Sequence, residues 1–220
     1  MDYERLYEYR FRNVDQADRE AVWREIAPYI TERALASPER LLDPAAGRRE
    51  FIAAAPAKER WAVDAVDYGA AVEGSGIRVV VAEIMSAELP ADHFDGVFVS
   101  NFLEHLGGQE RVHEFLRKIR AAMEPGGRIA IMGPNFRYCA KRYFDFADHI
   151  VALSHLAVAE HLHAAGYEVE RVTPRFLPYS FGGRLPASRA LTRAYLRSPW
   201  AWRLLGKQFL VVGRRPPAGA

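Results

Sequence analysis

The feature that most limits the possible folds is the alternation of short apolar runs with helical segments. Residues 40–43, 61–64, 77–84, 94–101 and 128–132 are rich in valine, isoleucine and other apolar residues, as strands are. Helices are predicted at residues 50–55 and 109–123, the second from the helical spacing of its apolar residues. Nearly continuous apolar runs, such as residues 77–84, are typical of strands buried on both faces. The alternation predicts an α/β fold with a doubly wound, mostly parallel sheet and helices on both faces.

The remaining chain extends this pattern at both ends. Residues 1–38 form an N-terminal helical segment, with Val22, Ile26, Tyr29 and Ile30 at helical spacing, that either packs on the domain or covers its site as a lid. A helix at 154–165, a strand at 167–173, a loop at 174–187, a helix at 188–205 broken at Pro199, and a strand at 208–213 complete seven strands. The main domain is therefore predicted at 39–214, with a disordered tail at 215–220.

The composition excludes several classes of protein. Thirty Lys and Arg residues against twenty-eight Asp and Glu residues leave a net charge of +2, which is too balanced to indicate nucleic-acid binding. The single cysteine, Cys139, excludes an internal disulfide and a zinc site built from several cysteines. The first residues contain no apolar signal core, and no stretch approaches the roughly 20 apolar residues of a membrane span. We expect a cytoplasmic protein without an integral membrane segment.

A small-residue loop follows the first strand and marks a candidate ligand site. It reads Leu42-Asp43-Pro44-Ala45-Ala46-Gly47, and small side chains let a ligand approach the backbone N–H groups. Asp64 ends the next strand, at the spacing that a βαβ unit needs to place a carboxylate on a ribose diol. The loop has one glycine where a dinucleotide fingerprint has three. Plain βαβ scaffolding therefore remains an alternative.

Taken together, the strand ends resemble those of class I S-adenosylmethionine-dependent methyltransferases, over about residues 40–214. The loop at 42–47 corresponds to the first, glycine-rich motif of that family. The more specific parts are the strand that begins Phe94-Asp95, with its Leu103-Glu104-His105-Leu106, and the turn Glu124-Pro125-Gly126-Gly127-Arg128. Residues 134–138, 143–149 and 174–179 resemble a bacterial subgroup that acts on small molecules. The resemblance implies a Rossmann-like fold and S-adenosylmethionine as the cofactor.

The resemblance also assigns roles at the cofactor. Ala45 and Gly47 would contact the methionine part, Asp64 the ribose hydroxyls, and Glu83 the adenine amino group, with Ile84 packing on the ring. Asn101 would hold the amino-acid end, and Asp43 begins the loop. Two positions depart from the family pattern, because Ala45 and Arg49 stand where the first and last glycines are usual. Arg49 either reaches the carboxylate of the methionine part or crowds it.

The acceptor side is expected in residues 135–155. A carboxylate beside a histidine orients it and raises its basicity, so His149, with Asp148 next to it, is the leading general base. His155 and Tyr138 are the next candidates, and a capped, solvated loop is the alternative. The predicted catalytic residues are His149, Asp148 and Tyr138, and the predicted substrate-binding residues are Asn135, Arg137, His155 and Arg175. His105 is predicted to be structural, hydrogen-bonded to a loop.

No metal site is predicted. His161 and His163 are two residues apart on a helix and do not share a face, and the spacing of Asp145, Asp148 and His149 singles out no metal. Arg189, Arg193 and Arg197 lie at helical spacing and form a basic stripe. This stripe is predicted to contact a phosphorylated or nucleotide-linked substrate, or an anionic membrane surface with the help of Trp200 and Trp202. Alternatively, it is a solvated helix face with the tryptophans in the core.

The sequence therefore predicts a methyltransferase that acts on a small molecule, at oxygen, in a sugar, nucleotide-linked or natural-product pathway. One rival is a non-methylating protein that holds S-adenosylmethionine or S-adenosylhomocysteine as a partner or regulatory subunit, which the altered loop suggests. The other is an RNA or protein methyltransferase. The balanced charge argues against RNA. Amino methyltransferases of that kind carry Asn/Asp-Pro-Pro-Tyr/Phe after strand four, where this chain has Ser100-Asn101-Phe102-Leu103.

Overall fold

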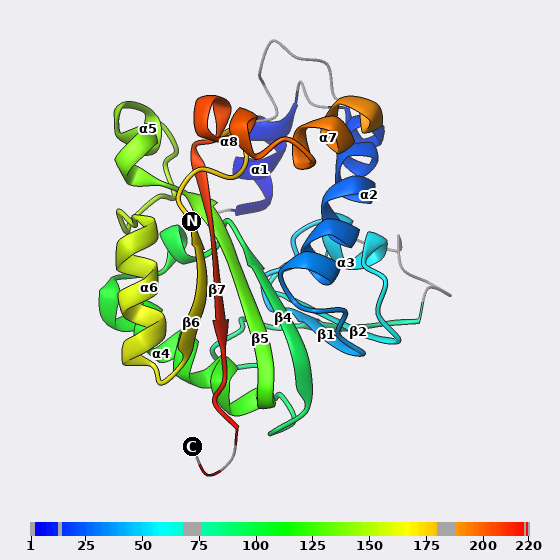
Figure 1. Cartoon of the computed structure of the whole chain (residues 1–220), viewed down its shortest axis with the longest axis vertical. Helices are drawn as coiled ribbons and strands as arrows, with labels where there is room; N and C mark the ends of the chain where they lie inside the picture. Colours follow the sequence, from blue (N-terminus) through cyan, green and yellow to red (C-terminus); the bar gives the residue numbers. More distant parts are fainter. Residues whose placement is uncertain (1–2, 13–14, 68–75, 180–187, 218, 220) are drawn as a thin grey trace.

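A computed structural model describes residues 3–12, 15–67, 76–179, 188–217 and 219 (Figure 1). Its helices are α1 (Tyr3–Phe11), α2 (Gln16–Arg33), α3 (Glu50–Ala54), the 3₁₀ helix η1 (Leu103–His105), α4 (Gln109–Ala122), α5 (Phe136–Tyr143), α6 (His155–Ala164), α7 (Arg189–Leu196) and α8 (Pro199–Leu205). Its strands are β1 (Arg40–Asp43), β2 (Glu59–Asp64), β3 (Ile77–Val81), β4 (Phe94–Ser100), β5 (Met123–Pro134), β6 (Glu168–Thr173) and β7 (Gln208–Arg214). None of the helices within these ranges is long and apolar enough to cross a membrane.

The strands form one seven-stranded sheet in the order β3-β2-β1-β4-β5-β7-β6. Strands β1 to β5 pair in parallel, whereas β7 runs antiparallel to both of its neighbours. The chain winds outward from β1 through β2 to β3, then returns to the middle at β4. Ligands of open α/β sheets bind beside such a reversal, at the carboxyl ends of the strands. Asp43 and Ser100 end the two central strands there.

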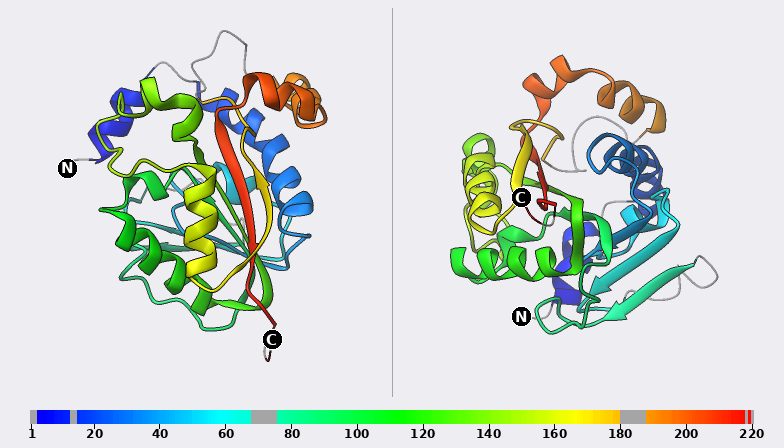
Figure 2. Two further views of the ribbon diagram at one scale, coloured as in Figure 1. Left: turned by 60° about the vertical axis from the view of Figure 1, so that its left-hand side comes forward. Right: turned by 60° about the horizontal axis from the view of Figure 1, so that its bottom comes forward.

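Helices cover both faces of the sheet, as predicted (Figure 2). On one face, α4 and α6 bury Phe115, Leu116 and Leu162 against alternate strand residues such as Val97 and Ile129. On the other face, α2, α3 and α7 pack on the residues in between. The second cluster includes Ile26, Ile30, Phe51, Ile52, Leu196, Phe98, Ala130 and Leu210. The two-residue period of the strands therefore divides the core into two layers.

The N-terminal helix α2 follows the sequence signals closely. Asp15 is its N-cap, and the carboxylate of Asp15 accepts from the backbone N–H of Ala17 at 2.8 Å. The helix continues through Pro28. Val22, Ile26 and Ile30 are buried against the sheet. The helix α2 is therefore held on the sheet through the apolar stripe visible in the sequence.

Three details differ from the predictions. The strand at 77–84 ends at Val81 and lies at the edge of the sheet, so it is not buried on both faces, and Val81 is 53% exposed. The turn at 124–127 lies within β5, where the pairing with β4 shifts register between Phe94 and Gly96. The segment after β5 forms α5, with Asn135 as its N-cap, and no helix was predicted there.

The segment after β7 is attached to the sheet at its first residue. Arg215, which the sequence analysis assigns to the tail, donates its backbone N–H to the carbonyl of Gly127 at 2.9 Å. Its guanidinium donates to the carbonyl of Met123 and pairs with Asp92. These contacts lie where β5 begins, at the end of the sheet opposite the candidate site.

Candidate active site

The loop after β1 is fixed by two hydrogen bonds to the end of β2. The N–H of Ala46 donates to the carbonyl of Val63 at 3.0 Å, and the N–H of Gly47 donates to Oδ2 of Asp64 at 2.7 Å. Gly47 has a φ of +50°, and a Cβ at this position would meet no described atom within 4 Å. The loop therefore leaves free space on the side of Gly47, where a ligand can approach the backbone.

The two departures from the family pattern have different structural costs. Ala45, a described residue, does not have a positive φ, so an alanine in place of glycine costs little there. Arg49 has a φ of +66°, which is the left-handed conformation that favours glycine and costs other residues about 1 kcal/mol. Its buried guanidinium pairs with Asp67 at 2.8 Å. Arg49 thus ties the start of α3 to the segment after β2.

Asp43 and Asp64 end neighbouring strands, yet their environments differ. Asp43 is 3% exposed, and burial raises its pKa well above the usual range, with smaller contributions from Asp64 and Glu50 in the same direction. Asp64 is partly exposed, and its Oδ1 accepts from the backbone N–H of Val66 at 3.0 Å. Asp64 therefore presents a carboxylate at the mouth of the loop, whereas Asp43 lies beneath it.

The other predicted cofactor residues lie on the segments after β3 and β4. Glu83 is exposed, and its backbone carbonyl begins a turn by accepting from the N–H groups of Ser86 and Ala87. Ile84 is buried. Asn101 is exposed and has a φ of +48°, and its Nδ2 donates to Oγ of Ser100. Both polar side chains are therefore accessible, at strand ends on either side of β1.

The predicted substrate-binding residues largely form one cluster. Asn135 is fully buried, and its Nδ2 donates to Nδ1 of His155 at 2.9 Å and to the carbonyl of Pro174 at 2.7 Å. The ring of Tyr138 stacks on His155 with centroids 6.3 Å apart, and the guanidinium of Arg175 lies 4.9 Å from the centroid of Tyr138. Arg175 also donates to the carbonyls of Gly206 and Leu204. Arg137 is exposed.

Asp148 does not act on His149 as the sequence suggests. Its Oδ1 pairs with Arg10 of α1, and its backbone carbonyl accepts from Nδ1 of His105 at 2.9 Å. Burial and then the neighbouring His105 lower the pKa of His149 to about 4, and the charge of Asp148 offsets this only in part. The expected rise in the basicity of His149 is therefore corrected to a fall. The structural hydrogen bond predicted for His105 is present.

The fold also brings together residues that the sequence analysis did not group. Glu104 is 3% exposed, and Oε1 of Glu104 lies 4.0 Å from Nε2 of His105. The rings of His105 and His149 have centroids 5.1 Å apart. Glu104 and His105 follow β4, whereas His149 follows α5. The motif Leu103-Glu104-His105-Leu106 was visible in the sequence, but nothing there linked it to His149.

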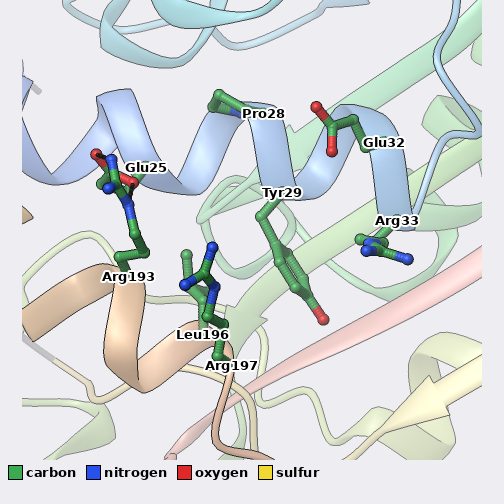
Figure 3. Close-up of a pocket in the computed structure, with 8 residues that line it drawn as sticks. All are labelled: Glu25, Pro28, Tyr29, Glu32, Arg33, Arg193, Leu196 and Arg197. Atoms are coloured by element: carbon green, nitrogen blue, oxygen red, sulfur yellow. Dashed lines mark hydrogen bonds and ion pairs between the residues drawn. The ribbon is translucent and has the colours of Figure 1, made fainter. Parts of the chain in front are cut away.

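A cavity of about 520 Å³ lies elsewhere, between α2 and α7 (Figure 3). Glu25, Pro28 and Tyr29 line it from α2, and Arg193 and Leu196 line it from α7. None of its lining residues is among the predicted catalytic, cofactor-binding or substrate-binding residues, but Arg193 and Arg197 belong to the basic stripe. Two arginines of the basic stripe, Arg189 and Arg193, both pair with Glu25. Two residues of the stripe thus join α7 to α2.

The comparison with sequence families decides the identity of the domain. A family described as a methyltransferase domain matches residues 16–172. The chain belongs to this methyltransferase family. No curated protein matches it. The match begins at α2 and extends into β6, so it includes the carboxyl ends of β1 to β5.

Solved structures of methyltransferases have the same fold. A SAM-dependent methyltransferase from Archaeoglobus fulgidus is 21% identical, with a TM-score of 0.64 over 97% of this chain and 100% of that chain. The 1,6-didemethyltoxoflavin-N1-methyltransferase of Burkholderia thailandensis, solved with S-adenosylhomocysteine, is 19% identical, with a TM-score of 0.58 over 98% of this chain and 89% of that chain. The [4+2]-cyclase SpnF is 16% identical, with a TM-score of 0.59 over 92% and 82%.

These findings confirm the predicted family and the Rossmann-like α/β fold. They agree with S-adenosylmethionine as the cofactor, because methyltransferases that use it are among the matching structures. The matching structures also include a cyclase. The acceptor and the atom that receives the methyl group therefore need an argument from the residues of this chain.

Proposed function

We propose that the protein is an S-adenosylmethionine-dependent methyltransferase that methylates a small molecule at oxygen. The observation that carries the proposal is the membership of residues 16–172 in the methyltransferase family, together with an open loop after β1 beside Asp64. A sugar, a nucleotide-linked compound or a natural-product intermediate is the proposed type of acceptor. Arg175, beside the Tyr138 ring, and the exposed Arg137 are suited to a polar or anionic acceptor.

The cofactor would lie across the carboxyl ends of β1, β2 and β4. Each oxygen of Asp64 accepts one backbone N–H, which leaves lone pairs for two ribose hydroxyls. The backbone at Ala45 and Gly47, above Asp43, would hold the methionine part, and Asn101 its amino-acid end. Glu83 and Ile84 would contact the adenine. These roles place one polar group at each end of the cofactor.

Methyl transfer requires mainly correct positioning. The acceptor oxygen forms a bond to the methyl carbon as the carbon–sulfur bond breaks, so S-adenosylhomocysteine leaves and the hydroxyl proton passes to a base or to solvent. With a pKa of about 4, His149 is neutral near pH 7 and can accept a proton, but it is a weak base. The exposed ring of Tyr138 would form the wall against which the acceptor lies, with His155 and Asn135 buried behind it.

The N-terminal segment, residues 1–38, would act as a partial lid. Arg10 of α1 pairs with Asp148, and its guanidinium lies 4.8 Å from the centroid of Phe146. These contacts cover the segment between α5 and α6, on the proposed acceptor side. A small-molecule acceptor that enters beneath α1 would suit this arrangement better than a nucleic acid, because the net charge of the chain is only +2.

The second candidate is a protein of the same fold that binds the cofactor without transferring its methyl group. Arg49 favours it, since an arginine in the left-handed conformation replaces a glycine and is paired with Asp67. The presence of a cyclase among structures of this fold shows that the fold hosts other chemistry. This candidate would serve as a partner or regulatory subunit in a biosynthetic pathway.

Isothermal titration with S-adenosylmethionine and S-adenosylhomocysteine tests the shared part of both candidates. We expect micromolar binding of each. A screen of hydroxylated acceptors, read by S-adenosylhomocysteine release, then separates them. Turnover supports the methyltransferase, and binding without turnover on any acceptor class supports the second candidate. No binding at millimolar ligand would refute both.

A further inference from the structure

We propose that Glu104, His105 and His149 form a binding site for one divalent transition-metal ion. A carboxylate oxygen of Glu104 and one ring nitrogen of each histidine all lie within 4.8 Å of one another. One carboxylate and two imidazoles, with further positions open, are the donor set of many catalytic zinc and non-haem iron sites. This inference departs from the sequence-based expectation of no metal, because only the fold brings His149 to Glu104.

The hydrogen bond of His105 orients the ring for metal binding. The backbone carbonyl of Asp148 can only accept, so Nδ1 of His105 carries the proton at 2.9 Å from that oxygen. Nε2 is then the unprotonated nitrogen, and it lies 4.0 Å from Oε1 of Glu104. Metal-binding histidines usually donate their second nitrogen to a carbonyl or carboxylate in this way. The ligand nitrogen of His105 therefore faces the carboxylate.

Glu104 is a buried carboxylate whose negative charge is poorly compensated. Its ion-pair contact is with the ring of His105, whose Nδ1 also lies 3.4 Å from Oδ2 of Asp148. Arg10, the cation nearby, is paired with Asp148 instead. A buried charge is costly without a counter-charge. A divalent ion bound by Glu104 would supply a counter-charge to its ionised form.

His149 supplies the third ligand from a rigid position. Its ring lies 5.0 Å from Phe146 and 5.0 Å from Tyr143, measured between centroids. Its Nδ1 is buried, and no group in the described part of the chain hydrogen-bonds to that atom. Atoms bound tetrahedrally to zinc at about 2.1 Å are about 3.4 Å apart, so the ligand atoms need to converge by no more than about 1.5 Å.

A metal ion at this place would act on the acceptor, and this part of the inference rests on the proposed function. The site lies after β4 and after α5, on the side where we place the acceptor. A hydroxyl coordinated at an open position would lose its proton to solvent more readily, and its oxygen would then attack the methyl carbon as the carbon–sulfur bond breaks.

Titration of untagged, chelator-treated protein with Co²⁺, followed by visible absorption, tests the inference. We expect one Co²⁺ per chain and competition by Zn²⁺. Glu104→Gln and His149→Gln should each weaken Co²⁺ binding at least tenfold. His163→Gln is the matched control, because His163 is an exposed histidine on α6, and it should bind as the wild type does. X-ray absorption of the Co²⁺-loaded wild type should show two imidazole ligands, and this measurement needs no variant.

Equal Co²⁺ binding by the wild type and both site variants, or no binding at millimolar Co²⁺, would overturn the inference. S-adenosylhomocysteine affinity, measured on the same samples, shows that each variant is folded. It also separates the two proposals. Metal binding without methyl transfer leaves the metal site standing and removes the proposed function. Turnover that is unaffected by chelation and by Glu104→Gln removes the metal's role at the acceptor.

Discussion

Replacing Asp64 with alanine should lower the stability of the protein at the loop after β1 and should also weaken cofactor binding there. Two backbone N–H groups, of Gly47 and Val66, donate to its carboxylate at 2.7 and 3.0 Å. Hydrogen bonds to a charged group each contribute about 1.5–3 kcal/mol, and water partly replaces them at this partly exposed site. A loss of about 2 kcal/mol in the free energy of unfolding follows, which lowers the Tm of a chain of this size by about 4–8 °C.

The same substitution removes the proposed acceptor of the ribose hydroxyls. The Kd for S-adenosylhomocysteine should rise at least tenfold, which corresponds to about 1.4 kcal/mol. Isothermal titration well below the Tm measures this loss separately from the loss of stability. Asp64→Asn, which keeps one acceptor oxygen but loses the charge, should give an intermediate Kd.

Asp95 provides a matched control at the other end of the sheet. Its two carboxylate oxygens accept from the backbone N–H groups of Glu39 and Arg40 at 2.8 and 2.7 Å. Asp95→Ala should therefore lower the Tm by a similar amount and leave the Kd for S-adenosylhomocysteine unchanged. If Asp64→Ala lowers the Tm but keeps the wild-type Kd, Asp64 only ties the loop, and the proposed ribose contact is wrong.

Two further predictions concern charge. Because burial raises the pKa of Asp43, its folded state is favoured when the carboxyl is protonated, and this contribution is lost as the pH rises through the folded pKa. Asp43→Asn imitates the protonated form, so in urea unfolding of the unliganded protein its stability relative to the wild type should increase as the pH is raised above 3.8, the ordinary pKa of an aspartate; a difference that does not depend on pH would contradict this. Glu25→Gln removes the pairing with Arg189 and Arg193, and should cost about 1 kcal/mol in low salt. High salt should weaken the wild type more than this variant in thermal unfolding, and parallel losses would show that the ion pairs contribute nothing.

The sequence predicts the sheet well because its signals are local. The apolar run of β4 and the buried stripe of α2, at Val22, Ile26 and Ile30, are each encoded within a short stretch of sequence. The burial of residues 77–84 could not be predicted in the same way. Whether a Val-rich run lies at the centre or the edge depends on strand order, and β3 has a single neighbour. The helix α5 was missed because its short segment was read only for its polar and aromatic side chains.

In the candidate site, too, the contacts set by local sequence could be predicted and those between distant segments could not. Residues after β1 and β2 fall into place from the spacing of one βαβ unit, which is why Gly47 and Asp64 are in contact. On the acceptor side, neighbours in sequence are not partners in space. Asp148 turns to Arg10 and His105, and its neighbour His149 turns to Phe146 and Tyr143. Such pairings depend on helix docking, which no short motif encodes.

The contact between Arg10 and Asp148 has a practical consequence for handling the protein. Arg10 of α1 contacts Asp148, and the backbone carbonyl of Asp148 accepts from His105. A tag or truncation at the N-terminus would therefore alter the acceptor side itself. The antiparallel β7 instead ends near the start of β5 (Figure 1). In the strand register, Arg214 of β7 lies opposite Arg128 of β5. An affinity tag at the C-terminus would therefore be attached at the far end of the strands, and purification handles should be added there.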